Sequence, residues 1–267
     1  MARPHFIPEI TDSFVEMHEQ YLVPAIYAQW AYRVAELAEI DLGDRVLDVA
    51  CGSGTLARAA QLETGLTGHV TGLDYSEKML EVARQHSKII DWQLGDAMAM
   101  PFDKNQFDRV LCQFALMFIE NRVRAIKEML RVCRPNGLIV MAVWSRREPG
   151  GAYDRLIQLV QRHAGVIAAE NLAAPWSLGK TGVMDALLLT SGVNEYECHE
   201  RIGQARYPSK QAFIDSHLQL ADALDSMDEE CYRNILSDGD SELRPFLSPG
   251  GQLIAHQNAN IFLVKNE

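Results

Sequence analysis

The segment Arg45–Leu56, with the sequence RVLDVACGSGTL, constrains the fold of this chain more than any other. Apolar-leaning residues lead into a pair of glycines, and a helix is expected to start directly after them. Such a strand, turn and helix bring free backbone N–H groups and a helix N-terminus to one point, where an anionic or zwitterionic ligand can bind. Glycine allows a close approach of that ligand because it has no Cβ.

The same pattern of short strands and helices repeats along the residues that follow. Strands are expected at 45–51, 69–75, 90–96, 109–118 and 138–144, and helices at 55–63, 77–87 (with Ser76 as N-cap) and 121–133, before a turn at 134–137. Later helices are expected at 150–171, 183–192, 209–224 and 225–243, and later strands at 195–207 and 251–267. The alternation predicts a mainly parallel sheet covered by helices on both faces, with an antiparallel edge.

A helical segment is expected before the first strand, over residues 12–40. Its apolar residues recur mostly at steps of three, four or seven, which places them on one helical face, and Pro24 should break or kink the helix. We therefore divide the chain into an N-terminal helical cap region, 1–40, and an α/β domain, 41–267. The latter should carry a substrate-covering helical insertion at about 146–190 and a further helical insertion at about 208–250.

Composition limits the classes of partner. The chain has 267 residues and a net charge of −11, which opposes binding to a nucleic-acid backbone. Five scattered cysteines without a CxxC pair fit a reducing compartment, and they predict neither disulfides nor a metal site. The most apolar run, Val110–Ile119, is too short to span a bilayer. We expect a soluble, cytoplasmic protein without membrane insertion.

Three ligands compete for the glycine turn. A nucleoside triphosphate would need the pattern GxxxxGK followed by Ser or Thr, and no lysine follows these glycines. A dinucleotide fits better, because residues 52–57 have the spacing G-x-G-x-x-A and Asp74 stands 20 residues beyond Gly54. That fingerprint alone cannot separate the cofactors.

Three further features favour a cofactor that carries a positive amine. Asp48 lies four residues before Gly52, inside the first strand, where a carboxylate would repel a pyrophosphate. Gly95-Asp96-Ala97 follows the third strand, where an acidic side chain can accept from an adenine amino group. No Tyr-x-x-x-Lys pair stands where a dehydrogenase would carry its proton relay.

Taken together in this order, VLDVACGSG, GLDYS and the stretch from LGDAMAMPF to GLIVMAVW resemble the class I S-adenosylmethionine-dependent methyltransferases. The chain is most similar to the small-molecule branch typified by ubiquinone- and menaquinone-biosynthesis methyltransferases. The resemblance is close from about Arg45 to Trp144. It implies a Rossmann-like, doubly wound, seven-stranded sheet of order 3-2-1-4-5-7-6 with strand 7 antiparallel, and S-adenosylmethionine as the cofactor.

The resemblance also implies roles for individual residues. Asp48, Ala50, Gly52 and Gly54 would hold the methionine half of the cofactor, although the family often has glycine at the position of Ala50. Asp74 would bind the ribose hydroxyls, with Tyr75 and Met79 beside the adenine and with Asp96 and Ala97 at its edge. Gln113 and Phe114 would lie near the methionine part, and Tyr21 would close over the cofactor.

The acceptor pocket is expected between the N-terminal helix and the insertion that follows the fifth strand. Tyr21, Tyr27 and Trp30 from the first, with Trp144, Trp176 and Tyr207 from the second, would make an apolar, aromatic wall. Several histidines lie in these covering regions, namely His5, His18, His199, His217 and His256. None of them can be named as a catalytic base from the sequence.

The sequence therefore supports one leading hypothesis and two alternatives. The leading hypothesis is an S-adenosylmethionine-dependent methyltransferase that acts on an oxygen, nitrogen or carbon nucleophile of a small molecule. The alternatives are an NAD(P)-dependent oxidoreductase and a non-catalytic S-adenosylmethionine-binding protein with the same fold.

Overall fold

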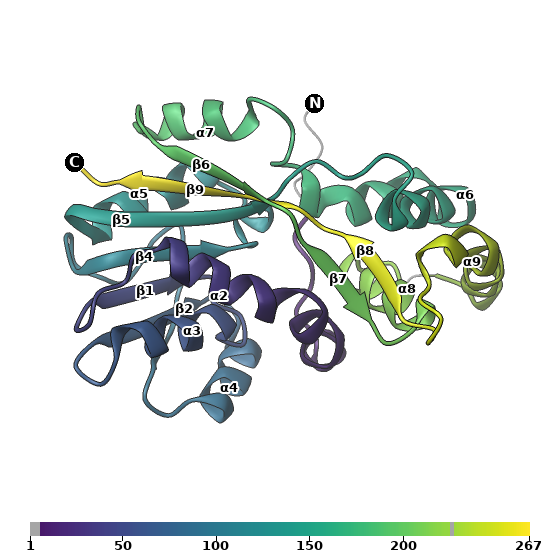
Figure 1. Cartoon of the computed structure of the whole chain (residues 1–267), viewed down its shortest axis with the longest axis horizontal. Helices are drawn as coiled ribbons and strands as arrows, with labels where there is room; N and C mark the ends of the chain where they lie inside the picture. Colours follow the sequence, from purple (N-terminus) through teal and green to yellow (C-terminus); the bar gives the residue numbers. More distant parts are fainter. Residues whose placement is uncertain (1–5, 225–226) are drawn as a thin grey trace.

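A seven-stranded mixed sheet forms the centre of the molecule in the computed structural model, which describes residues 6–224 and 227–267 (Figure 1). Its strands are β1 (Arg45–Val49), β2 (His69–Asp74), β3 (Asp91–Leu94), β4 (Phe107–Gln113), β5 (Cys133–Trp144), β6 (Glu197–Arg201) and β9 (Ala259–Lys265). They follow the order β3-β2-β1-β4-β5-β9-β6, and β9 is antiparallel to both of its neighbours. The predicted strand order and the antiparallel seventh strand are confirmed.

Helices cover both faces of this sheet, as expected for parallel strands that are apolar on both sides. The helices α2 (Ala28–Leu37) and α3 (Thr55–Thr64) pack together and lie in front of the strands in Figure 1. On the other face α5 (Arg122–Val132) packs against α7 (Val183–Ser191), and α4 (Glu77–His86) packs near β3 at the end of the sheet. The predicted caps are confirmed: the Ser76 hydroxyl accepts from the Met79 N–H, and Gly192 ends α7 in a left-handed conformation.

The N-terminal segment is a continuous helical stretch that changes from α-helix to π-helix and back to α-helix. It consists of α1 (Asp12–Met17), a π-helix (His18–Tyr27) and α2. Pro24 does not end the helical stretch, but it lies inside the π-helix, where the winding departs from that of α1 and α2. Proline lacks an N–H and crowds the preceding turn, and the wider π-turn accommodates both defects.

The two late strands each divide in two, where the sequence predicted continuous strands. The first run gives β6 and then β7 (Gln204–Tyr207), and the second gives β8 (Leu253–His256) and then β9. β7 and β8 form a separate two-stranded sheet, to the right of the main sheet in Figure 1. The bend falls at Gly203, where a Cβ would lie 2.3 Å from the Trp30 ring, so the chain needs glycine to pass this side chain.

A cap lies beside the carboxyl ends of the parallel strands and contains β7, β8 and three helices. These helices are α6 (Ala152–Ala173), α8 (Lys210–Leu220) and α9 (Glu229–Glu242), on the right in Figure 1. α9 packs against α6 and α8. Of the segment 146–190, α6 therefore lies in the cap, whereas α7 packs on α5 at the sheet. Within the described ranges no helix has the length and apolar character needed to cross a membrane.

The expected turn at Arg134–Gly137 is wrong, because these residues lie within β5. The register between β4 and β5 shifts from Phe107 paired with Cys133 to Arg109 paired with Leu138, which marks a bulge. Asn136 adopts a φ of 62° there, and its N–H donates to the Asn266 carbonyl at 2.6 Å. The proline, asparagine and glycine that predicted a turn therefore lie in the bulged first part of β5.

The side chain of Trp92 on β3 reaches across β2 to the glycine turn. A Cβ on Gly72 would lie 2.4 Å from the Trp92 ring, and one on Gly54 would lie 2.1 Å from it. Gly54 also has a φ of 81°, in the left-handed region. Both glycines therefore make room for one indole that joins β3 to the turn after β1.

Gly72→Ala should destabilise the fold by about 1–3 kcal/mol, since it forces the Trp92 ring out of its site. The free energy of unfolding, measured by urea titration, checks this value. In a Trp92→Leu background the same glycine substitution should cost less, and the two changes form a double-mutant cycle. Equal costs in the two backgrounds would contradict the packing argument.

Candidate functional site

A cavity of about 360 Å³ opens at the carboxyl ends of the central parallel strands. Ten of the twelve residues predicted to bind the cofactor line this cavity: Asp48, Ala50, Gly52, Asp74, Tyr75, Met79, Asp96, Ala97, Gln113 and Phe114. They come from four strand ends, which converge because parallel strands present their carboxyl ends at one edge. The structure thus gathers most of the predicted set in one place.

The other two predicted residues, Gly54 and Tyr21, do not line the cavity. Gly54 faces the Trp92 ring, so it supports the turn from behind. Tyr21 is half-buried and packs against the hydrophobic core. On the π-helix the cavity-lining aromatic side chain is Tyr27 instead.

Asp48 brings a buried carboxylate to the cavity wall. Its side chain is 1% exposed, and Oδ2 has no hydrogen-bond partner among the described residues. Burial raises the pKa of Asp48 to about 8, and the nearby Asp74 carboxylate adds to the rise. An acceptor this deeply buried is costly unless a donor reaches it, so the site is built for a ligand that donates there.

Gln113, at the end of β4, presents a second acceptor without a donor. Its Nε2 donates to the Tyr27 carbonyl at 3.3 Å, while its buried Oε1 has no partner among the described residues. The next residue, Phe114, has a φ of 51° and turns its ring onto Trp144, with ring centroids 3.4 Å apart. That strained backbone ends β4 early and directs the following residues along the cavity.

Asp74 ties the glycine turn to the end of β2. Its Oδ2 accepts from the Gly52 N–H at 2.8 Å and its Oδ1 accepts from the Ser76 N–H at 2.9 Å. Burial raises the pKa of this carboxyl, and the two N–H donors oppose the rise. Each oxygen keeps a lone pair for a further donor, so the carboxylate is both fixed and available.

The turn itself keeps space open for a ligand. Gly52 has a φ of 55°, and nothing lies within 4 Å of where its Cβ would be. Ala50 also has a φ of 55°, which explains why the family often places glycine there. Alanine accepts this left-handed conformation at a cost of about 1–2 kcal/mol.

The N-terminal segment supplies a wall of which the sequence prediction named Tyr27 as a pocket aromatic and His18 as a covering histidine, but not the other residues. Phe14, His18 and Tyr27 line the cavity, together with Ile7 and Ile10 ahead of α1. His18 stacks on Tyr27 at 5.1 Å between centroids, and burial raises the pKa of Tyr27 to about 12. Apolar periodicity showed that these residues share a helical face, but it could not show that the face closes a cavity.

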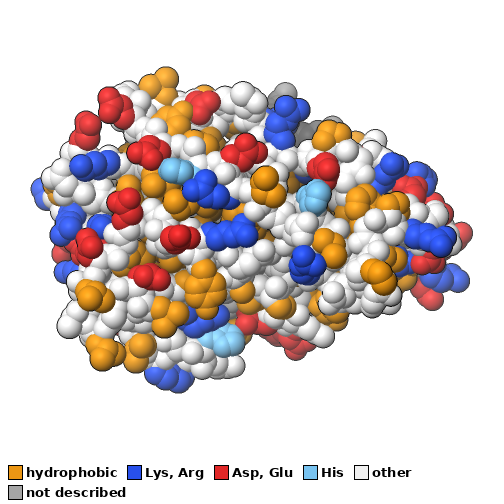
Figure 2. All heavy atoms as spheres, viewed as in Figure 1, with side chains coloured by type: hydrophobic (Ala, Val, Ile, Leu, Met, Phe, Trp, Pro, Cys, Tyr) orange, Lys and Arg blue, Asp and Glu red, His pale blue; other side chains and the backbone are white. Residues whose placement is uncertain are grey.

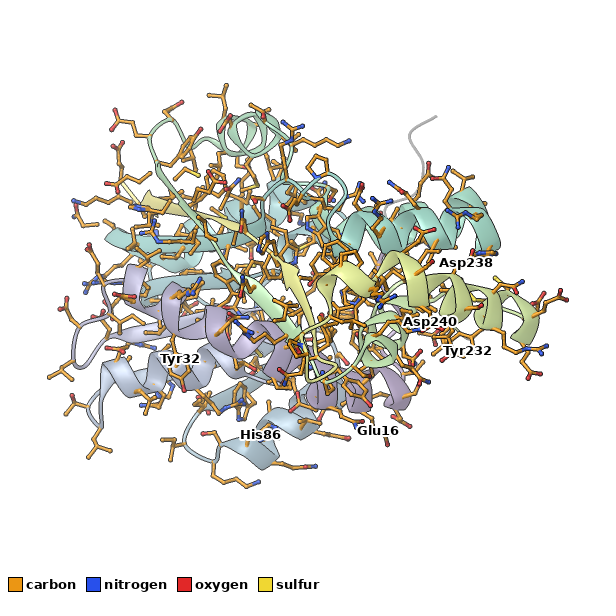
Figure 3. The ribbon with its side chains drawn as sticks, turned by 45° about the vertical axis from the view of Figure 1, so that its right-hand side comes forward. Glu16, Tyr32, His86, Tyr232, Asp238 and Asp240 are labelled. Carbon is orange, nitrogen blue, oxygen red and sulfur yellow. The ribbon has the colours of Figure 1, made fainter. Side chains whose placement is uncertain are left out.

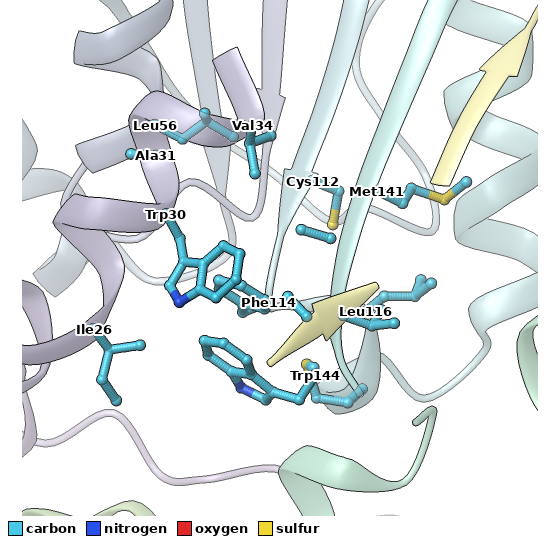
Figure 4. Close-up of a cluster of buried hydrophobic side chains, with 14 of the residues drawn as sticks. Ile26, Trp30, Ala31, Val34, Leu56, Cys112, Phe114, Leu116, Met141 and Trp144 are labelled. Carbon is cyan, nitrogen blue, oxygen red and sulfur yellow. The ribbon is translucent and has the colours of Figure 1, made fainter. Parts of the chain in front are cut away.

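The four residues predicted to contact the acceptor do not line the cavity. Trp30, Trp144, Trp176 and Tyr207 are buried, with exposures of 0, 3, 7 and 0%. Trp30 and Trp144 pack edge to face at 6.0 Å and enclose Phe114, as Figure 4 shows. These large side chains fill the core between the sheet and the cap, because burying their apolar surface there is favourable.

The histidines of the covering regions lie in different environments. His18 lines the cavity, whereas His199 and His256 lie on strands outside it. His217 is buried in α8, where its Nδ1 bonds to the Phe213 carbonyl, and burial lowers its pKa to about 4. His5 lies outside the described residues.

The central part of the chain is similar in sequence to known methyltransferases. Residues 47–141 match the sequence family described as a methyltransferase domain. Over 114 residues the chain is 41% identical to a demethylmenaquinone methyltransferase of Staphylococcus epidermidis, which covers 42% of this chain and 47% of that protein. The chain thus matches about half the length of the curated relatives.

Solved structures extend the similarity of fold over most of the chain. The YcgJ protein of Bacillus subtilis superposes with a TM-score of 0.60 at 18% identity, covering 90% of this chain and 99% of that one. A Haemonchus contortus phosphoethanolamine N-methyltransferase 2, solved in complex with S-adenosyl-L-methionine, gives a TM-score of 0.59 at 16% identity. It covers 96% of this chain and 58% of that one.

Residues 47–141 belong to a methyltransferase domain. The cofactor of this class of domain is S-adenosylmethionine, in agreement with the sequence prediction. The cavity of the methyltransferase domain lies at the strand ends where the class holds its cofactor, although the individual cofactor contacts stay predictions.

Asp48 should make the cofactor-free methyltransferase domain less stable as the pH rises. Its folded pKa of about 8 lies above the ordinary value of 3.8, so the folded state holds the proton more tightly than the unfolded state. Stability is therefore greatest below about pH 4 for this group and falls as the pH rises through about 8.

Asp48→Asn removes this ionisation. At about pH 8 the variant should be more stable than the wild type by several kcal/mol, about 1.4 kcal/mol for each pH unit above about 4, and the difference should vanish near pH 4. Urea unfolding across this pH range measures the effect, with the exposed Asp103→Asn as control. A variant that is equally or less stable at the higher pH would refute the prediction.

Proposed function

We propose that this chain transfers a methyl group from S-adenosylmethionine to a small-molecule acceptor. The observation that carries the proposal is the pair of buried acceptors, Asp48 Oδ2 and Gln113 Oε1, that line one cavity without donors of their own. A ligand with a protonated amine beside a sulfonium satisfies both oxygens and neutralises the carboxylate.

The remaining lining residues suit the other parts of that cofactor. Asp74 keeps lone pairs that can accept from the ribose hydroxyls, and Gly52 leaves room for the methionine chain. Tyr75, Met79 and Ala97 offer apolar contacts for the adenine, and Asp96 is exposed beside them. When bound, the cofactor supplies an activated methyl group, and the chain's own residues align the acceptor and exclude water.

The same cavity supports an apolar acceptor. Beyond the polar strand ends its wall is made by Ile10, Phe14, Phe118, Ile119 and Leu220. The curated relatives are named for a menaquinone precursor, which is an apolar aromatic compound. We therefore place this chain's acceptor among hydroxylated aromatic molecules.

Surface charge favours the same class over nucleic acid. The net charge is −11, and Figure 2 shows acidic and basic side chains interspersed over the face in view. Binding a phosphate backbone would need clustered cations. The oxidoreductase alternative is disfavoured by Asp48, which would stand against a pyrophosphate.

Calorimetry with S-adenosylhomocysteine tests the cofactor assignment. The wild type should bind it, and Asp74→Ala should lose about 1.5–3 kcal/mol of binding free energy, the range for hydrogen bonds to charged groups. Because Asp74 also holds Gly52 and Ser76, the melting temperature of the variant is measured in parallel. The Asp103→Asn variant should bind as the wild type does.

Two results would refute the proposed function. One is the absence of S-adenosylhomocysteine binding by the wild type together with clear NADH binding. The other is tight cofactor binding without any methylated product across a broad panel of small-molecule acceptors that includes 1,4-naphthalenediol and simple phenols, which would favour the non-catalytic alternative.

Asp48 should also couple cofactor binding to proton release. A carboxyl with a pKa of about 8 is mostly protonated at pH 7, and a bound ammonium favours its ionised form. Titrations at pH 7 in buffers of different ionisation enthalpy should show a net release of protons from the wild type. The release should be absent from Asp48→Asn, and an unchanged release would contradict the assignment.

A further inference from the structure

The cavity wall carries a histidine whose orientation is fixed from three sides. His18 lies between Phe14 and Tyr27, with ring centroids at 6.2 and 5.1 Å and interplanar angles of 26° and 27°. Its Nδ1 lies 3.1 Å from Glu19 Oε1. The side chain is 11% exposed and lines the cavity, so the imidazole has one defined pose at this wall.

Glu19 joins this histidine to a second one at the surface. Its Oε2 lies 2.8 Å from Nε2 of His86, which projects from α4 and is 42% exposed (Figure 3). Burial alone would raise the pKa of Glu19, but the interactions with His18, Ser53 and His86 outweigh burial and lower the pKa to about 2. One carboxylate that stays ionised thus connects a cavity histidine to a solvent-facing one.

The charged groups around His18 come from several elements. Glu19 lies on its own helix, Asp74 ends β2 and interacts electrostatically with His18, and His86 lies on α4. Arg58 of α3 acts on Glu19. Two carboxylates and one guanidinium thus lie in the surroundings of the imidazole.

His18 is also connected to one of the two oxygen atoms, Asp48 Oδ2 and Gln113 Oε1, that lack hydrogen-bond donors among the described residues. His18 stacks on Tyr27, and the Tyr27 carbonyl accepts from Gln113, whose other amide atom is one of the two unpartnered acceptors. The apolar side chains Phe14 and Ile10 continue the wall from His18. The imidazole therefore lies on the cavity wall between the Phe14 and Tyr27 rings, on the same wall as the Tyr27 carbonyl that holds the Gln113 amide.

We propose that His18 is the general base of this site and that the Glu19 carboxylate orients its imidazole and supplies a negative charge beside it. The acceptor is then an aromatic compound with an acidic hydroxyl. The proposal rests on the proposed function. Glu19 holds the Nδ1–H of a neutral imidazole, which leaves Nε2 free to take a proton.

The step balances as follows. The acceptor hydroxyl loses its proton to Nε2 of His18, and an electron pair of the acceptor's oxygen, or of a ring carbon conjugated to it, forms the new bond to the methyl carbon. The electron pair of the broken carbon–sulfur bond stays on sulfur. The products are the methylated acceptor, S-adenosylhomocysteine and a protonated His18, which returns its proton to water.

The first experiment separates the base from the cofactor site. With 1,4-naphthalenediol as acceptor, His18→Asn should lower kcat by about 100-fold or more, as expected for loss of a general base. Its affinity for S-adenosylhomocysteine should stay within about threefold of the wild type, because asparagine keeps a polar contact to Glu19. The matched control is His69→Asn, which changes a histidine–carboxylate pair (3.3 Å to Asp91) at the opposite end of β2.

Glu19→Gln tests the positioning role with a readout that packing alone would not move. The amide keeps the shape of the side chain but removes the charge that stabilises the protonated imidazole. The acid limb of the profile of kcat/KM against pH should move to lower pH, and kcat should fall by about tenfold. In ¹⁵N spectra of the labelled protein, the ring nitrogens of His18 should also lose the pattern of a dominant Nδ1–H form.

A binding measurement with 4-nitrophenol needs no turnover, because the ionised phenol absorbs in the visible. In the complex of wild type with S-adenosylhomocysteine, about one pH unit below its own ionisation, the bound phenol should be largely ionised. The ionised fraction should fall in His18→Asn and remain in His69→Asn. This readout keeps the proposal testable even if 1,4-naphthalenediol is not the acceptor used in the cell.

The outcomes separate this inference from the proposed function. If the wild type fails to bind S-adenosylhomocysteine, the proposed function fails first. The inference alone is overturned if the cofactor binds but 4-nitrophenol does not bind or does not ionise. It is equally overturned if His18→Asn retains full kcat, or if its affinity for S-adenosylhomocysteine falls in parallel with kcat, which would make His18 a cofactor ligand.

Discussion

The site depends on one electrostatic constraint, the burial of the Asp48 carboxylate with one oxygen, Oδ2, that has no donor among the described residues. A carboxylate at 1% exposure with an unpartnered oxygen costs several kcal/mol in its ionised form, so the apo protein keeps it largely protonated. Only a ligand that carries positive charge to the end of β1 relieves that cost. The strand register, the glycine turn and the Gln113 amide all serve to hold this acceptor where such a ligand can reach it.

The rest of the cavity is assembled from parts that are distant in the chain. Asp74 fixes the turn after β1 to the end of β2, and Trp92 joins β3 to the same turn through Gly54. The π-helix then lays Tyr27 and His18 across the open side. The wider winding that tolerates Pro24 belongs to the same helical stretch that bears these two side chains. A local backbone irregularity thus coincides with the functional wall.

The polar half of the site could be predicted because it follows strand ends. Asp48, Gly52, Asp74 and Asp96 each stand at the carboxyl end of a strand or in the turn after it, and parallel strands bring those ends together. The apolar half could not be predicted in the same way. Trp30 and Trp144 looked like pocket residues, yet they fill the core, since burial of a large aromatic depends on neighbours that are distant in sequence.

The sequence by itself determined the glycine turn, the mainly parallel sheet and the carboxylates at three strand ends, because periodicity and turn chemistry are local properties. The order of the seven strands came from the family resemblance that the sequence carries. Only the tertiary structure decided which side of the N-terminal helical stretch faces the ligand, where the late strands bend, and that His18, Glu19 and His86 form one chain of contacts. Those features arise from packing between α4, the π-helix and the cap. No local pattern encodes the distance between two helices.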